Sequence, residues 1–447
     1  MSSRFARELT RRPRKRSLKS IFGRAVFTGF LVAIFCGPAY AQQIIPFIVV
    51  NHEPNTAEQQ QKHYVVMVSL DGFRYDYAKK YGAKHILEIA RKGASAPDGM
   101  IPSYPSLTFP NHYTLVTGLY PEHHGIVANN FYDPDRKETY SYHDPKTSGD
   151  GSWYGGVPLW SLAEKQGMRS ACLFWPGSEA EIAGKRPSYY LHFDNKIDEN
   201  KRIDQVIAWL NLPAEQRPHF VTLYYSNVDH AGHEYGPGSP QVAEATKHVD
   251  ELIGRLEEKL DGLHLPIDLI VVADHGMERA QGDWITLDRY VSLEGIEIVG
   301  SMLYPPTEAD AVRIYKKLRA ADAGFLVYRR DKVPAELHYN SNPREGDPVV
   351  IAKGPYLIRA TAPPASARVE NPLGEHGYNP YEMTAMRAIF FAEGPDIRPG
   401  VTVKPFENVN VFPVVVKILG LESPKVDGSL NVLSPILVPS LTDEAQH

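Results

Sequence analysis

Apolar residues along the chain gather in short runs that alternate with segments of helical spacing. Continuous apolar runs at Tyr64–Leu70, in HFVTLYY and in DLIVVADHG are typical of strands buried on both faces of a sheet. Between them, Ile203–Leu210 and SPQVAEATKHVDELIGRLEEKL have the spacing of amphipathic helices, the latter with Ser239 as its expected N-cap. This alternation predicts an α/β fold with a mostly parallel sheet and helices on both faces.

Further elements follow the same rhythm. One helix is predicted from Tyr77 to Lys92, closing at Gly93. Another follows Thr108, with Pro110 in its first turn and Gly118 at its end. PLWSLAEKQG is a predicted helix and SACLFW a predicted strand; near the end of the chain, MRAIFFAEG is a predicted strand and VNVFPVVVKILG a helix.

The alternation breaks between about 280 and 370, where shorter strands and one helix are separated by Pro-rich turns. We interpret this stretch as a smaller α+β lobe inserted before the core resumes at His376. A chain of 447 residues is long enough for one large domain with such an insertion. The predicted catalytic domain spans 63–435, after an N-terminal lead at 42–62 and before a C-terminal tail at 436–447.

The first segment has the features of an export signal. RRPRKRSLK is basic, Ala25–Gly37 is apolar, and Ala-Tyr-Ala at 39–41 is a small-residue cleavage site. The apolar run is too short to span a bilayer comfortably. Residues 1–41 are therefore predicted to be a cleaved signal peptide, leaving no stable membrane anchor; a retained anchor is the alternative.

Cleavage would change both the charge and the cysteine content. The segment carries nine basic residues and one acidic one, so the net charge falls from −5 to −13. An acidic protein that binds an anionic substrate needs a local positive centre, which a metal supplies. Only Cys172 would remain, so no internal disulfide is possible, which favours a bacterial periplasmic or secreted location. No basic cluster with interleaved aromatics indicates a nucleic-acid surface.

Residues of metal-binding type follow the ends of the predicted strands. Because ligands of open α/β sheets bind beyond the carboxyl ends of strands, we expect these side chains to meet at one edge. The adjacent carboxylate and imidazole in VVADHGM are awkward as pure structure, since a buried aspartate must be paired or coordinated. The candidate ligands are Asp71, Asp229, His233, Asp274, His275 and His376.

Three carboxylates and three imidazoles form an oxygen and nitrogen set that suits two zinc-like cations. Two such cations can bind the attacking and leaving oxygens of a phosphoryl transfer. Thr108, at a helix start, is the candidate nucleophile, and metal coordination would stabilise its alkoxide. The Phe109 N–H is the expected donor to the developing oxyanion.

Several motifs resemble a known family in their order along the chain. VSLDGFR, PSYPSLTFPNHYTLVTGLYPEHHGI, NNFYDP, FWPGSEA, SNVDHAGHEYGP, VVADHGM and EHGYNP are similar to the nucleotide pyrophosphatase/phosphodiesterase family of the alkaline phosphatase superfamily. The similarity runs from about Tyr64 to Gly420. The resemblance implies an alkaline-phosphatase-like fold with two Zn²⁺ per chain, one held by Asp229, His233 and His376 and the other by Asp71, Asp274, His275 and Thr108.

The resemblance also implies roles in catalysis. Thr108 would attack phosphorus and form a phospho-threonine intermediate that water then hydrolyses. Asn129 would hydrogen-bond a non-bridging phosphate oxygen and so serve both catalysis and substrate binding. The expected substrates are nucleotide-type phosphodiesters and pyrophosphates, and the expected products are nucleoside monophosphates.

The surroundings of the nucleophile favour a diester. No lysine or arginine lies between Ile101 and Arg136 to neutralise the extra charge of a monoester. Phe109 is placed to stack on a base, with Tyr224 or the Tyr189/Tyr190 pair on the other side. We therefore predict Phe109, Asn129, Tyr224 and Tyr190 as substrate contacts.

Other functions stay open at this point. A lipid-headgroup phosphodiesterase that accepts choline would need an aromatic and acidic cage, which the sequence does not locate. A phosphate monoesterase is a further alternative. A non-catalytic binding protein fits poorly with an intact nucleophile and ligand set. The sequence does not identify the physiological substrate or the oligomeric state.

Overall fold

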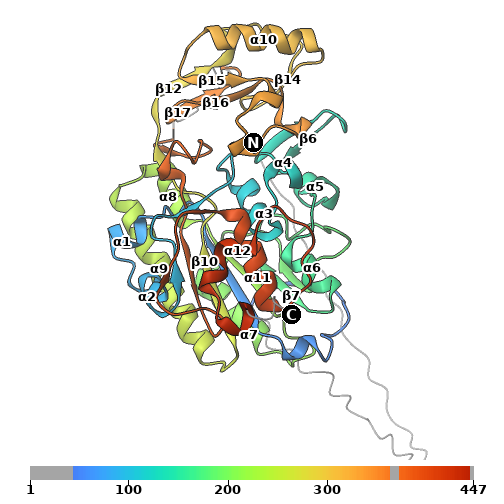
Figure 1. The fold of residues 1–447 in the computed structure, drawn as a ribbon, viewed down its shortest axis with the longest axis vertical. Coiled ribbons are helices and arrows are strands. Elements are labelled where there is room, and N and C mark those ends of the chain that lie inside the picture. The colour runs from blue at the N-terminus through green and yellow to red at the C-terminus, as the bar shows by residue number, and fades with distance from the viewer. Residues whose placement is uncertain (1–43, 363–371, 443–447) are drawn as a thin grey trace, which may run out of the picture. The chain divides into compact units, whose positions relative to one another are not determined.

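The computed structural model of the chain describes residues 44–362 and 372–442. Within them, a nine-stranded sheet forms the core (Figure 1). In spatial order its strands are β1 (Ile48–Val49), β8 (Tyr189–Leu191), β7 (Ser170–Leu173), β9 (Phe220–Tyr225), β2 (Tyr64–Leu70), β10 (Ile267–Val272), β19 (Phe390–Glu393), β3 (Ala94–Ser95) and β20 (Val401–Thr402).

The sheet is mostly parallel, as predicted. Strands β8, β7, β9, β2 and β10 all run in the same direction. Strands β1 and β19 are antiparallel to their neighbours. Every residue of β2 and β9 is buried, which explains why both strands are continuous apolar runs in the sequence. The prediction of an α/β fold built on a mostly parallel sheet is confirmed.

Helices cover both faces of the sheet (Figure 1). Helices that pack against one another on one face are α1 (Tyr77–Tyr81), α2 (Lys84–Lys92), α7 (Glu199–Leu210) and α9 (Pro240–Asp261). On the other face lie α3 (Thr108–Thr117), α6 (Leu159–Lys165) and α11 (Val411–Leu419), of which α11 packs on both β2 and α3. The Ser239 hydroxyl accepts a hydrogen bond from the Val242 N–H at 3.2 Å, as expected of an N-cap.

Two helices differ from the prediction. The expected helix from Tyr77 to Lys92 is split into α1 and α2, because Gly82 takes a left-handed conformation with φ 70° and ends the first helix. Helix α7 begins at Glu199, earlier than the apolar spacing indicated. The Asp198 carboxylate caps it by accepting from the Lys201 N–H.

A second hydrophobic cluster, separate from the main core, lies between Leu287 and Ala360. We call the elements around it the lobe. They are β12 (Gln281–Thr286), β13 (Glu297–Val299), β14 (Met302–Tyr304), α10 (Glu308–Ala320), β15 (Phe325–Tyr328), β16 (Val349–Ala352) and β17 (Tyr356–Arg359). Paired strands β12–β17, β13–β14 and β15–β16 carry α10 above them (Figure 1).

The segments at either end of the described region are more closely packed than the sequence indicated. Strand β1, in the expected lead, joins the sheet by pairing with β8. Ile436 and Leu437, at the start of the expected tail, are buried in the main core. The predicted signal peptide lies outside the described residues. Within the described residues, no helix combines the length and apolarity needed to cross a membrane.

The remaining strands and α-helices are short. They are β4 (Met100–Ile101), α4 (Pro121–His124), β5 (Asn130–Asp133), β6 (Glu138–Ser141), α5 (Pro145–Ser148), α8 (Asn227–Tyr235), β11 (Glu278–Arg279), β18 (Gly374–Glu375), β21 (Phe406–Glu407), α12 (Leu430–Leu433) and α13 (Pro439–Thr442).

Candidate active site

The predicted ligand residues meet at one edge of the sheet, beyond three adjacent strands. Asp71 follows β2, Asp229 lies in α8 directly after β9, and Asp274 follows β10. Strand β2 lies between the other two, so the loops after all three strands emerge side by side. The carboxyl ends of parallel strands are where open α/β sheets bind ligands.

The turn after β2 depends on glycine. Gly72 has φ 68°, and a Cβ on it would lie 2.8 Å from the Asp229 Cα. The Asp229 N–H donates to the Asp71 carbonyl at 3.0 Å, and the Gly72 N–H donates to Asp274 Oδ1 at 3.2 Å. Only a residue without a side chain lets these segments approach so closely.

One group of three ligand-type side chains consists of Asp71, Asp274 and His275, all buried. One ligand atom from each lies within 4.8 Å of the other two. His275 Nε2 is 3.0 Å from Asp274 Oδ2 and 3.6 Å from Asp71 Oδ1. Burial and the nearby Asp274 carboxylate raise the pKa of Asp71 well above its usual range. We call this group the Asp71 triad.

The second group consists of Asp229, His233 and His376, again with ligand atoms within 4.8 Å of one another. His233 Nε2 and His376 Nε2 lie only 3.2 Å apart, and Asp229 Oδ1 is 3.4 Å and 3.7 Å from them. Asp229 and His233 are four residues apart in α8, which places them on one helix face. We call this group the Asp229 triad.

All three imidazoles are oriented in the same way. The Nδ1–H groups of His233, His275 and His376 donate to the backbone carbonyls of Gly374, Gly276 and Ser106, each at 2.9 Å. A carbonyl only accepts, so Nδ1 carries the proton and Nε2 is free to bind a cation. Metal-binding histidines are typically held by such a second hydrogen bond.

The proton affinities of these imidazoles reflect the carboxylates around them. Burial opposes the charged form, but the Asp274 carboxylate raises the pKa of His275 to about 10. In the same way, against burial, Asp229 raises the pKa of His233 to about 9. Burial and the neighbouring His275 lower the pKa of His376 to about 3. Protons therefore take the positions that cations would take, which indicates that the site favours positive charge.

Buried carboxylate oxygens that lack a hydrogen-bond partner show whether the two triads fit metal ions. Asp71 Oδ1, Asp229 Oδ1 and Asp274 Oδ2 are buried and have no hydrogen-bond donor of normal geometry. Such atoms are costly unless they are coordinated or paired. Each of these oxygens lies 3.0–3.6 Å from a histidine Nε2 atom of its own triad. These residues fit a pair of divalent cations.

Thr108 lies beside the Asp71 triad as the first residue of α3. Its Oγ1 is 3.3 Å from His275 Nε2. The preceding residue, Leu107, has an extended backbone, so the chain turns into the helix at the hydroxyl. The helix N-terminus adds the positive end of its dipole beside this oxygen.

Asn129 lies beside Thr108, the candidate nucleophile, but the Phe109 N–H has a different hydrogen-bond partner from the one expected. That N–H donates to Asn129 Oδ1 at 2.9 Å, so it is engaged in orienting the amide and does not point at an oxyanion. The Asn129 NH₂ group remains the donor available to substrate.

His112 and Tyr224 contact Thr108 and the candidate aspartate ligands. The Tyr224 hydroxyl donates to Asp71 Oδ2 at 2.6 Å. His112 Nδ1 is 2.9 Å from the Thr108 carbonyl and 3.4 Å from Asp274 Oδ2, and its Nε2 is 2.8 Å from Ser69 Oγ. The sequence assigned Tyr224 to a stacking surface. Its hydroxyl instead fixes a metal-ligand candidate, although the ring also lines the adjacent cavity.

A cavity of about 350 Å³ opens beside Thr108, and its wall includes Asp71 and all three residues of the Asp229 triad. Its aromatic lining includes Phe109, Tyr142 and Phe193, and Phe193 is 54% exposed. The rings of Phe109 and Tyr142 are 5.2 Å apart. Tyr190, predicted as a contact, is buried in β8 and does not belong to this lining. The sequence had no signal for Phe193, which follows β8 in the chain.

Comparison with known proteins places the chain in a family. The profile of the type I phosphodiesterase/nucleotide pyrophosphatase family matches residues 65–379. An uncharacterised pyrophosphatase/phosphodiesterase of Schizosaccharomyces pombe is 32% identical over 91% of this chain and 86% of the relative. Human ectonucleotide pyrophosphatase/phosphodiesterase family member 1 is 33% identical over 87% of this chain, which spans only 44% of that relative.

Solved structures agree with this assignment. Murine ectonucleotide pyrophosphatase/phosphodiesterase 5, as an inactive threonine-to-alanine variant in complex with AMP, superimposes with a TM-score of 0.78. The two chains are 28% identical, and the match covers 84% of this chain and all of the murine one. The chain therefore belongs to the type I phosphodiesterase/nucleotide pyrophosphatase family of hydrolases.

Proposed function

We propose that the protein is an exported, zinc-dependent phosphodiesterase that hydrolyses nucleotide-type diesters and pyrophosphates to nucleoside monophosphates. The observation that carries the proposal is the meeting of the two triads beside the Thr108 hydroxyl. Three buried aspartates and three oriented imidazoles form a site that two Zn²⁺ ions would complete. Bound there, the cations would stabilise the negative charge of the nucleophile and of the phosphoryl group.

Zinc suits the donor set better than magnesium or calcium. Each triad supplies histidine nitrogen as well as carboxylate oxygen. Magnesium and calcium prefer sites made of oxygen alone. Asp229, His233 and His376 would hold one ion. The other would be held by Asp71, Asp274, His275 and the Thr108 oxygen.

Thr108 would act as the nucleophile. Its Oγ forms a bond to phosphorus while the bond to the first alcohol or nucleotide breaks, which leaves a phospho-threonine. Water then hydrolyses this intermediate. The amide of Asn129, oriented by the Phe109 N–H, donates to a non-bridging phosphate oxygen. The N-terminus of α3 favours the negative charge of the phosphoryl group.

The cavity beside Thr108 suits a nucleotide. Phe109 and Phe193 offer ring surfaces on which a base can stack. Among the described residues that line it, none is lysine or arginine, so an additional phosphate charge of a monoester would lack a partner. The murine relative was solved with AMP, which supports a nucleoside monophosphate as the product.

A choline headgroup fits this cavity less well. Glu179 is the acidic residue in the aromatic part of the lining, as a cage for a quaternary ammonium would require. Its carboxylate is already paired with His192 and accepts a hydrogen bond from the Phe193 N–H at 2.8 Å. Both oxygens of the carboxylate that a choline cation would contact thus already have hydrogen-bond partners within the protein.

Export is proposed from the first 41 residues alone. N-terminal sequencing of protein recovered from the periplasm or culture medium of a bacterial host tests it. We expect the mature chain to start at Gln42. A chain that starts at Met1 and is retained in the membrane fraction would instead support an anchor.

The nucleophile is tested by Thr108→Ala with thymidine 5′-p-nitrophenyl phosphate as substrate. We expect kcat/KM to fall by about 10³-fold or more, on the order of several kcal/mol of transition-state stabilisation, with the zinc content largely kept. Thr108→Ser, which keeps a hydroxyl, is the matched control and should retain measurable turnover. An alanine variant as active as wild type would rule out this nucleophile. Faster hydrolysis of p-nitrophenyl phosphate or of a choline diester by wild type would change the substrate class.

A further inference from the structure

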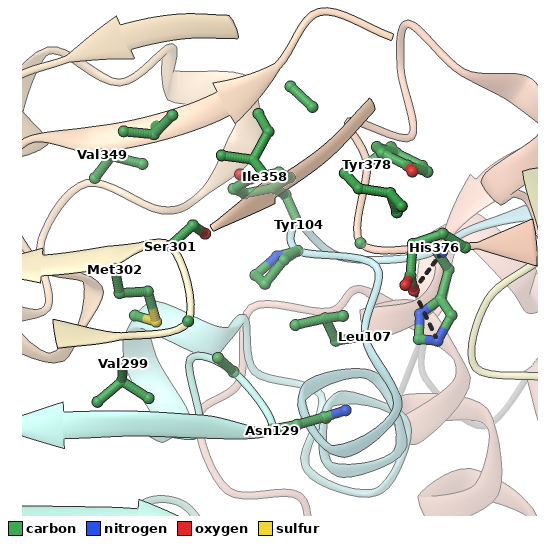
Figure 2. A pocket seen from close by; sticks show the side chains of 18 of the residues that line it. Tyr104, Leu107, Asn129, Val299, Ser301, Met302, Val349, Ile358, His376 and Tyr378 are labelled. Carbon is green, nitrogen blue, oxygen red and sulfur yellow. Dashed lines mark hydrogen bonds and ion pairs between the residues drawn. The ribbon is translucent and has the colours of Figure 1, made fainter. Parts of the chain in front are cut away.

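A second cavity, of about 500 Å³, adjoins the candidate active site. It lies between the lobe and the segments at 104–107, 128–130 and 375–378. Figure 2 shows His376 at one side of this cavity and Met302 at the other, with Leu107 between them. Asn129 and His376 line both this cavity and the one beside Thr108. The two cavities therefore meet at the candidate phosphoryl site.

A diester has two organic arms on its phosphorus, and two cavities meet where that phosphorus would lie. In a phosphoryl transfer the attacking and leaving oxygens are roughly in line, on opposite sides of phosphorus. Thr108 contacts the Asp71 triad at His275, whose Nε2 is 3.3 Å from Thr108 Oγ1. His376, which opens onto the larger cavity, belongs to the Asp229 triad. The arm opposite Thr108 is thus directed toward the larger cavity.

The lining of this cavity is aromatic and apolar. Tyr104, Trp284 and Tyr378 contribute rings, and Val299 and Met302 contribute aliphatic surface. Among the described residues that line it, none is lysine or arginine. A chain of phosphates placed here would lose water without gaining a counter-charge, which is costly.

The two acidic residues in the lining, Glu345 and Glu375, do not make the cavity more favourable for phosphates. Burial, with the neighbouring Glu122 carboxylate, raises the pKa of Glu345 to about 9, so Glu345 is neutral at pH 7. Glu375 accepts a hydrogen bond from the His376 N–H at 3.0 Å. Neither residue provides the positive charge that a pyrophosphate would require.

We propose that the 500 Å³ cavity binds the leaving arm of the diester as an uncharged, preferably aromatic alcohol. The enzyme then favours phosphodiesters of organic alcohols, such as dinucleoside monophosphates, over nucleoside triphosphates, whose leaving group is a charged pyrophosphate. The bond from phosphorus to the arm in this cavity breaks as the Thr108 Oγ–phosphorus bond forms. The departing arm leaves as the alcohol, with the proton that Thr108 gives up. This inference rests on the proposed function.

Ser301 offers a way to fill the cavity without disturbing the fold. It lies in the two-residue turn between β13 and β14, where Gly300 takes the left-handed conformation with φ 62°. Ser301 itself is partly exposed, lines the cavity, and is not among the residues with positive φ. A larger side chain there is compatible with the hairpin.

The test compares Ser301→Trp with wild type on a dinucleoside monophosphate and on ATP. We expect kcat/KM for the dinucleoside to fall by about tenfold or more, as when stacking of one base is lost, with kcat/KM for ATP within about twofold of wild type. Ser292→Trp, at an exposed position in the lobe outside the lining, is the matched control and should change neither.

Ser301→Lys tests for an increase in kcat/KM, which misfolding could not produce. We expect its kcat/KM for ATP to rise several-fold as the added charge meets the pyrophosphate, while the dinucleoside loses rate. Equal losses on both substrates with either variant, or no loss on either, would overturn the inference. Failure of wild type to hydrolyse any of these substrates would instead overturn the proposed function.

Discussion

At the scale of single residues, the candidate ligand atoms are held in place by groups outside the triads. Backbone carbonyls fix the three imidazoles, and the Tyr224 hydroxyl fixes the Asp71 carboxylate. Such supporting hydrogen bonds tune both the orientation and the affinity of a metal site.

Tyr224→Phe isolates the hydrogen bond to Asp71. We expect zinc affinity, measured by competition with a chelator, to fall by about 10- to 100-fold, because Asp71 loses its donor while the ring stays. Tyr225→Phe is the matched control, since its hydroxyl faces the Glu199 carbonyl at 3.5 Å, away from the site. Unchanged affinity in Tyr224→Phe would mean that this side chain serves only as a cavity wall.

At the scale of elements, the turn after β2 brings the two triads together. Gly72 combines a left-handed backbone with contact to Asp229, whereas Gly82 has a similar φ of 70° and nothing within 4 Å of a Cβ. Substitutions at these two glycines therefore distinguish the cost of a positive φ from the cost of crowding. This contrast gives a direct measure of what the close approach costs.

Gly72→Ala should destabilise the protein more than Gly82→Ala. Both substitutions impose the strain of positive φ, on the order of 1 kcal/mol, but only at Gly72 does the new Cβ meet the Asp229 backbone at 2.8 Å. We expect the free energy of unfolding, from urea titration, to fall by roughly 1–3 kcal/mol more for Gly72→Ala, with loss of bound zinc. Equal losses at both positions would show that the turn tolerates a side chain.

The elements could be predicted where one signal dominates. β2 and β10 follow from unbroken apolar runs, and the clustering of the candidate ligands follows from polar residues at strand ends. The split at Gly82 was missed because helical spacing continues through it. Tyr224 has a role that the sequence did not indicate. Phe193 lines the cavity although the sequence had no signal for it. Their positions depend on contacts between segments far apart in the chain, which periodicity does not encode.

At the scale of the whole molecule, two cavities share a wall at Asn129 and His376, and the lobe lines the larger of them. Glu345 belongs to this boundary: it is 2% exposed, and both of its carboxylate oxygens lack hydrogen-bond donors. A buried acid of this kind stays protonated in the folded state and ionises in the unfolded state.

Glu345 should make stability decrease as pH rises. Its folded pKa of about 9 lies above the ordinary value, so between about pH 4.3 and 9 the unfolded chain releases this proton and is favoured. We expect Glu345→Gln to unfold at higher temperature than wild type at pH 8 and to lose this advantage at pH 4.5, both in metal-free protein. The same difference in melting temperature at the two pH values would contradict the assignment.

The central claim is that the two triads hold two cations beside Thr108, and anomalous diffraction at the zinc edge from zinc-grown crystals tests it most directly. We predict two peaks per chain, each at zinc-bonding distance, about 2.0–2.3 Å, from its own triad, with Thr108 Oγ bound to the ion of the Asp71 triad. Zinc found elsewhere, or His376 or Asp71 more than about 6 Å from any ion, would contradict the account.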